Sequence, residues 1–137
     1  MTTFEYQESS GIVICKLIID NRTYVGSARC HPNDTYSKRV GERLSYDRAS
    51  IKYLREKRNE LIVQLKGLRH LLSIYNQSSR VKKENYEYKM LSRQITALEN
   101  DIYEMKYVID EIKEVDKQYV KDYARIIQRE KANSNNG

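Results

Sequence analysis

Tryptophan is absent from this chain of 137 residues, proline occurs once and glycine only five times. So few turn-forming residues predict long, uninterrupted elements rather than many short ones. No apolar run approaches the roughly 18 residues that a membrane span needs, and no signal peptide opens the sequence. We therefore expect no membrane span. The longest apolar patch, 12–19, is interrupted by Lys16 and is typical of a strand.

Cysteine and histidine are also scarce, at two residues each. Cys15 and Cys30 form no CxxC pair, so we interpret them as reduced thiols of a cytoplasmic protein, with a cross-strand disulfide as the alternative. No motif of a P-loop enzyme, a serine hydrolase or a zinc peptidase is present. We expect no catalytic residues, no metal ligands and no cofactor. A hydrolase using His31 with Asp47 or Glu42 is the enzymatic alternative.

The first 34 residues predict an antiparallel meander of three strands. Ser-Gly and Asp-Asn pairs supply the turns between apolar, β-branched runs. The expected strands are 3–7, 12–20 and 22–30. In the third strand, Gly26 and Ala28 share one face with little bulk, which leaves room for a closely packed helix or for a ligand. A helix is the more frequent explanation.

From Tyr36 the apolar period changes to a heptad, which predicts two long helices. The first seam consists of Ile51, Leu54, Arg58, Leu61, Leu65, Leu68, Leu72 and Tyr75. The second consists of Leu91, Ile95, Leu98, Ile102, Met105, Ile109, Ile112, Asp116, Tyr119, Tyr123 and Ile126. The polar break 76–79 predicts that the helices, at about 35–76 and 80–131, fold back on each other. Asn33 or Asp34 is the expected cap of the first helix.

The predicted fold class is therefore α+β: a three-stranded antiparallel sheet followed by a long antiparallel helical hairpin, as one functional domain. We expect a disordered tail at 132–137, which is rich in asparagine and serine. Helices of 40–50 residues reach roughly 60–75 Å, more than a small sheet can cover. Apolar positions also lie outside the strict seam, namely Ile62, Leu71, Val108 and Ile127. We therefore expect the hairpin to pack on a second copy of itself.

The charge of +6 is concentrated in one segment. Residues 36–76 hold ten Lys/Arg and four Asp/Glu, so this segment accounts for the whole excess. A basic stripe suits phosphate, in nucleic acid or in a small nucleotide, and a solvated helix face is the simpler alternative. Arginine contacts phosphate in a bidentate manner, and tyrosine offers a face for base stacking. The candidate ligand-binding residues are Arg29, His31, Arg43, Arg48, Tyr103, Tyr107, Arg125 and Arg129.

Different observations support the individual candidates. Arg29 and His31 leave the third strand just before a helix N-terminus, where unpaired N–H groups attract phosphate. Tyr103 and Tyr107 lie at i,i+4 just off the seam. Arg125 and Arg129 repeat that spacing near the C-terminus, where cations also favour the helix dipole.

The stretch Tyr-Val-Gly-Ser-Ala-Arg-Cys-His-Pro-Asn-Asp at 24–34, followed by Lys-Arg-Val-Gly-Glu-Arg-Leu-Ser-Tyr-Asp-Arg-Ala at 38–49, resembles the Thoeris anti-defence protein 1 family of phage proteins. The resemblance implies a non-catalytic sponge acting in the host bacterial cytoplasm. Such proteins bind the glycocyclic ADP-ribose signal of a bacterial immune system and hold it intact. Members can also hold cyclic di- or trinucleotide signals in separate pockets.

The resemblance further implies assembly as dimers building to hexamers, with signal pockets completed by a neighbouring subunit. The arginine after Gly-x-Ala is a ligand residue in the family and falls on Arg29. The family's aromatic and arginine ligands on the last helix have no matching signature here. A nucleic-acid-binding protein using the basic first helix is the alternative function. A purely structural coiled coil is a second alternative.

Overall fold

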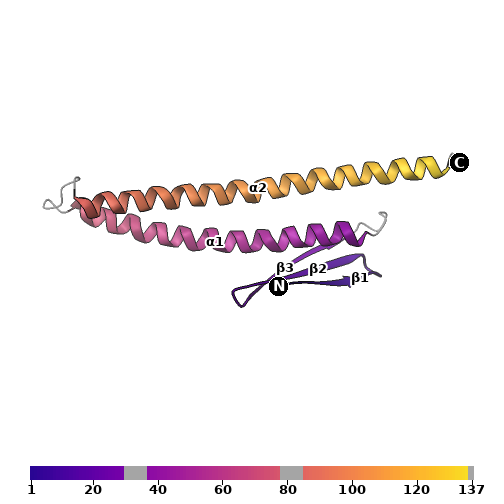
Figure 1. The fold of residues 1–137 in the computed structure, drawn as a ribbon, viewed down its shortest axis with the longest axis horizontal. Helices are drawn as coiled ribbons and strands as arrows, with labels where there is room; N and C mark the ends of the chain where they lie inside the picture. The colour runs from indigo at the N-terminus through magenta and orange to yellow at the C-terminus, as the bar shows by residue number, and fades with distance from the viewer. Residues whose placement is uncertain (30–36, 78–84, 136–137) are drawn as a thin grey trace. The chain divides into compact units, whose positions relative to one another are not determined.

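The computed structural model describes residues 1–29, 37–77 and 85–135. In chain order it contains the strands β1 (Thr2–Gln7), β2 (Ile12–Ile19) and β3 (Arg22–Arg29), then the helices α1 (Lys38–Gln77) and α2 (Tyr86–Asn135) (Figure 1). This is the predicted α+β order, with an antiparallel sheet before two long helices. The contacts of the chain fall into two compact units: unit 1 is Met1–Tyr53 with Ile109–Gly137, and unit 2 is Leu54–Val108.

The sheet is a meander in which β2 lies between β1 and β3. The turn between β2 and β3 consists of Asp20 and Asn21, whose φ angles are 51° and 64°. Two positive φ values in a two-residue hairpin turn match the right-handed twist of the strands, and Asp and Asn tolerate them better than most side chains. The predicted strand bounds are confirmed to within one residue at each end.

One face of the sheet packs against the first turns of α1 in unit 1. Cys15, Leu17 and Tyr24 are buried there with Ala49 of the helix. The backbones of β3 and α1 lie in close contact at Gly26. A Cβ atom at this position would overlap the carbonyl oxygen of Ser45 and the amide nitrogen of Ala49. α1 therefore fills the space beside Gly26 and Ala28. Of the two explanations for this face, a closely packed helix or a ligand, the helix is confirmed.

Both helices begin at a side-chain cap, later in the chain than predicted. Ser37 Oγ accepts a hydrogen bond from the Val40 amide at 3.3 Å, so Ser37 caps α1. Asn85 Oδ1 accepts one from the Glu87 amide at 2.8 Å and caps α2. Each cap satisfies an N–H group that lacks an intrahelical partner. The expected caps Asn33 and Asp34 lie outside the described residues.

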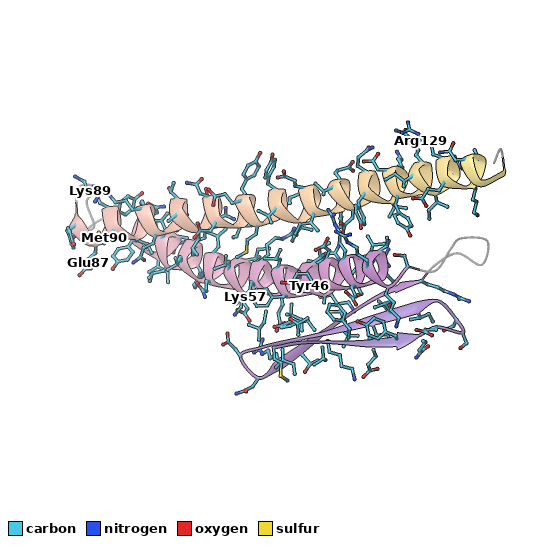
Figure 2. All side chains as sticks on the ribbon, turned by 45° about the vertical axis from the view of Figure 1, so that its right-hand side comes forward. Tyr46, Lys57, Glu87, Lys89, Met90 and Arg129 are labelled. Carbon is cyan, nitrogen blue, oxygen red and sulfur yellow. The ribbon has the colours of Figure 1, made fainter. Side chains whose placement is uncertain are left out.

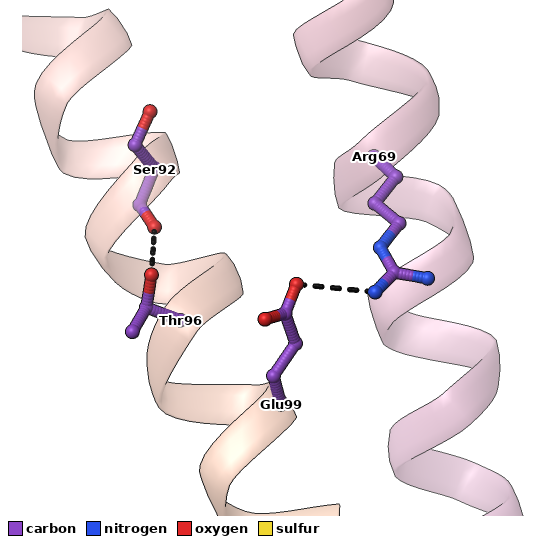
Figure 3. A network of polar contacts seen from close by, with 4 residues as sticks. All are labelled: Arg69, Ser92, Thr96 and Glu99. Carbon is purple, nitrogen blue, oxygen red and sulfur yellow. Dashed lines mark hydrogen bonds and ion pairs between the residues drawn. The ribbon is translucent and has the colours of Figure 1, made fainter.

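In unit 2 the two helices pack in antiparallel fashion along the predicted seam. Leu65 is buried against Leu91 and Ile95. The flanking seam residues are partly buried: Leu68, Leu72, Tyr75, Leu98 and Ile102. On the surface beside this seam, Arg69 Nη2 donates a hydrogen bond to Glu99 Oε1 at 3.1 Å (Figure 3).

The C-terminal part of α2 departs from the prediction in two places. Ile126 is 51% exposed and Ile127 is half-buried instead, because a straight helix of 3.6 residues per turn drifts from a strict heptad. The helix also continues to Asn135, so residues 132–135 are helical rather than the start of a disordered tail. Ala132 favours this extension, since alanine is the best helix former. Within the described residues, neither helix contains an apolar stretch long enough to cross a membrane.

Candidate functional site

The end of β3 carries Arg29, the first candidate ligand residue. Arg29 is the last residue of β3 and is exposed, while Gly26 and Ala28 of the same strand are buried. Because α1 closes the inner face of the sheet, a ligand that contacts this strand must do so on the outer face. His31, the second candidate here, lies outside the described residues.

Arg48 supports this strand end from α1. Its Nη1 donates a hydrogen bond of 2.7 Å to the carbonyl oxygen of Ser27, two residues before Arg29. The carbonyl gains a charged donor, which makes a shorter and stronger hydrogen bond than a neutral one. Arg48 was predicted as a ligand contact, and in the structure its guanidinium fixes the backbone beside Arg29.

Arg43 joins α1 to the C-terminal half of α2 within unit 1. Its Nε lies 3.7 Å from Asp116 Oδ1, and its guanidinium carbon lies 3.9 Å from the centroid of the Tyr119 ring. A guanidinium over a tyrosine face is a cation–π contact. This second predicted ligand residue is therefore engaged with an anion and an aromatic ring of its own chain.

Asp116 is a carboxyl group whose pKa is strongly raised. Its side chain is 14% exposed, and its buried Oδ1 accepts no hydrogen bond from any described residue. Burial, together with a hydrogen bond and like charge from Asp47, raises the pKa of Asp116 to about 7, although Arg43 and Arg48 favour its ionised form. The sequence analysis placed Asp116 in the second heptad seam but assigned it no function. A carboxylate at a seam position that is usually apolar is the signal that could have identified it.

The remaining candidates lie on α2 in different units. Tyr103 and Tyr107 belong to unit 2 and are 72% and 61% exposed. Arg125 and Arg129 belong to unit 1, where Arg129 projects from the C-terminal part of the helix (Figure 2). Arg125 Nη1 lies 4.0 Å from Asp122 Oδ1 on its own helix. Within unit 1, no described hydrogen bond or ion pair joins Arg125 or Arg129 to Arg29.

Unit 2 also contains a groove that the sequence did not predict. Its volume is about 310 Å³, near the lower limit for small-molecule sites. The lining residues are Arg58, Ile62, Leu65, Arg69, Glu99, Ile102, Tyr103 and Lys106. Only Tyr103 among them was a candidate ligand residue. Arg58 had been recognised solely as a cation within the apolar seam.

The described part of the chain contains no cluster of three or more His, Cys, Asp or Glu side chains that could hold a metal ion. Cys15 is a buried free thiol, and burial raises its pKa. Cys30 lies outside the described residues, so its pairing stays a prediction. No protein-family model, curated protein or solved structure matches this chain.

Proposed function

We propose that this protein captures a cyclic ADP-ribose-type signalling nucleotide and holds it without cleaving it, as the Thoeris anti-defence protein 1 family does. The observation that carries the proposal is the motif Gly26-Ser27-Ala28-Arg29 at the end of β3, whose arginine is exposed where the family binds its signal. The order of three strands and two long helices is the architecture that the resemblance implies.

The chemistry of capture differs from that of catalysis. A sequestering protein needs cations to neutralise a pyrophosphate and a surface that excludes water, and it needs no general base. Arg29 supplies the first phosphate contact in this proposal, and His31 the second. Arg48 acts through the Ser27 carbonyl, so that the strand end is fixed before the ligand arrives. Such preorganisation lowers the cost of binding.

The protein would act in the host bacterial cytoplasm as a homo-oligomer, a dimer building to a hexamer. A neighbouring copy completes the pocket, and Tyr103, Tyr107, Arg125 and Arg129 are the candidates for that contribution. Their exposure leaves them accessible to a second copy. Cyclic di- or trinucleotides are proposed ligands at separate positions.

Nucleic-acid binding by the basic first helix draws less support. Five of the cations on α1 are engaged with the protein's own oxygen atoms: Lys38, Arg43, Arg48, Lys57 and Arg69. Cations held in this way are less available to a phosphate backbone. If duplex binding does occur, its affinity must fall steeply with salt, because each neutralised phosphate releases a counterion.

The test is calorimetric titration of the purified protein with glycocyclic ADP-ribose isomers, followed by heating the complex and analysing what it releases. We expect saturable uptake and release of unaltered ligand. Release of a cleaved product would show that the protein is an enzyme. Absence of uptake for every isomer would contradict the proposal, and cyclic oligonucleotides and duplex nucleic acid then identify which alternative holds.

A further inference from the structure

The groove in unit 2 combines an apolar floor with an excess of positive charge. Ile62, Leu65 and Ile102 form the floor, and the lining contributes three cations against the single carboxylate of Glu99. That carboxylate is already held by Arg69 (Figure 3). The groove therefore lacks a neutralising group for its other two cations.

Those two cations are Arg58 and Lys106. Neither makes a hydrogen bond or an ion pair with any other described residue. Arg58 is also half-buried at a seam position, where removing a charge from water is costly unless an anion accompanies it. An external partner with carboxylates and apolar side chains would neutralise the two cations and cover the apolar floor of the groove.

The chain itself presents such a surface. Asp101, Glu104 and Val108 stand at i, i+3 and i+7 on α2, so they share one face of the helix. This is a different face from the one that Ile102 and Lys106 turn toward the groove. Val108 is 43% exposed, and both carboxylates are exposed and have no hydrogen-bond or ion-pair partner among the described residues. We call these three residues the acidic stripe.

We infer that the groove of one molecule binds the acidic stripe of a second copy of this chain. The carboxylates meet Arg58 and Lys106, and Val108 covers Ile62. The stripe runs from Asp101 to Val108, about 10 Å along a helix, and the groove runs along α1 from Arg58 to Arg69, about 16 Å, so the stripe fits within it. The inference rests on the self-association proposed above and not on nucleotide capture.

The contact joins two different surfaces of identical chains. Such head-to-tail contacts repeat from molecule to molecule and end only when a ring closes. Association through the groove therefore proceeds beyond a dimer, in contrast to a two-fold interface in which one surface meets itself.

The experiment measures self-association of the full chain by sedimentation velocity without nucleotide. We expect the wild-type chain to associate, and Lys106→Glu and Glu104→Lys each to raise the dissociation constant about tenfold or more, since a like charge now faces the partner. The double variant restores an opposite pair across the contact and should return close to the wild-type value. Positions 104 and 106 do not face each other on one helix, so this rescue cannot arise within a chain.

Lys89→Glu is the matched control, because it makes the same charge change on α2 outside the groove lining and the acidic stripe. It should associate like the wild type. A monomeric wild-type chain, single reversals without effect, or a double variant as weak as the single ones would each overturn the inference. Circular dichroism of every variant verifies the fold. Association with failed nucleotide uptake would contradict the proposed function and leave this contact standing.

Discussion

The guanidinium carbon of Arg43 lies 3.9 Å from the ring centroid of Tyr119, and this contact joins α1 to α2 within unit 1. The same guanidinium approaches Asp116, whose neighbour on α1 is Asp47. Two carboxylates close together in a partly buried site do not ionise independently. The packing of the helices in unit 1 is therefore linked to the uptake of a proton.

We predict that the free energy of unfolding falls as the pH rises from about 4 to 7. The pKa of Asp116 is raised from 3.8 to about 7 in the folded protein, so the folded state binds the additional proton between these values. Stability from this group is present at low pH and is lost as the pH rises through the folded pKa. We expect about 1 kcal/mol per pH unit, below the single-site limit of about 1.4, because solvent screens part of the interaction at a site that is only partly buried.

Asp116→Asn isolates this contribution, since other carboxyl groups also titrate in the same range. Urea unfolding at several pH values should show a smaller loss of stability for the variant than for the wild type. Equal slopes for the two proteins would mean that Asp116 titrates normally.

Gly26→Ala should destabilise unit 1 by about 3 kcal/mol, at the upper end for overpacking, because the new methyl group meets backbone atoms of α1 that cannot rotate away. Gly67→Ala is the control. A Cβ atom at position 67 has no neighbour within 4 Å, and alanine favours the helix by about 0.5–1 kcal/mol. Thermal unfolding should therefore move the two variants in opposite directions. Similar shifts would contradict the close contact of β3 with α1.

Arg58→Leu should stabilise unit 2 by about 1 kcal/mol, because leucine at a half-buried seam position replaces a charge by an apolar side chain. Denaturant unfolding in dilute solution measures this effect. Arg55→Leu, an exposed position outside the seam, should leave stability nearly unchanged. A loss of stability in Arg58→Leu would show that the guanidinium has a stabilising partner.

Arg29→Ala should weaken the uptake of glycocyclic ADP-ribose by about 2 kcal/mol, the value of a lost charge-assisted contact, and should leave the melting temperature unchanged because Arg29 is exposed. Arg22→Ala, at the opposite end of β3, is the comparison and should bind normally. Calorimetric titration of both variants with glycocyclic ADP-ribose measures this difference in affinity. Unfolding of Arg29→Ala would reveal a structural arginine instead.

The sequence predicted most of the fold because its local patterns agree with the tertiary structure. Alternation defined the strands, the Asp20-Asn21 pair defined the turn, and the heptads defined which sides of the helices meet. The helix boundaries were wrong, and so was the seam position of Ile126 near the end of α2. Ser37 and Asn85 cap the helices because their side chains reach the free N–H groups, and composition alone did not distinguish them from neighbouring polar residues.

The candidate site was less predictable, because its chemistry depends on distant positions. The charge of Arg43 appears free in the sequence, and only the register of α1 against α2 brings it to Asp116 and Tyr119. Likewise, Arg48 reaches Ser27 because Gly26 lets the helix approach the strand. Spacing within a helix contains no information about these partners.

Asp116 has one more consequence, for how the helices of unit 1 choose their alignment. Heptad seams are repetitive, so a slide by seven residues would still match apolar side chains with apolar side chains. Such a slide, however, would carry Asp116 away from Arg43 and leave its carboxylate buried without a cation. Asp116 thus favours one alignment of the two helices over the alignments shifted by seven residues. The apolar seam residues can therefore be exchanged for one another without a change of this alignment.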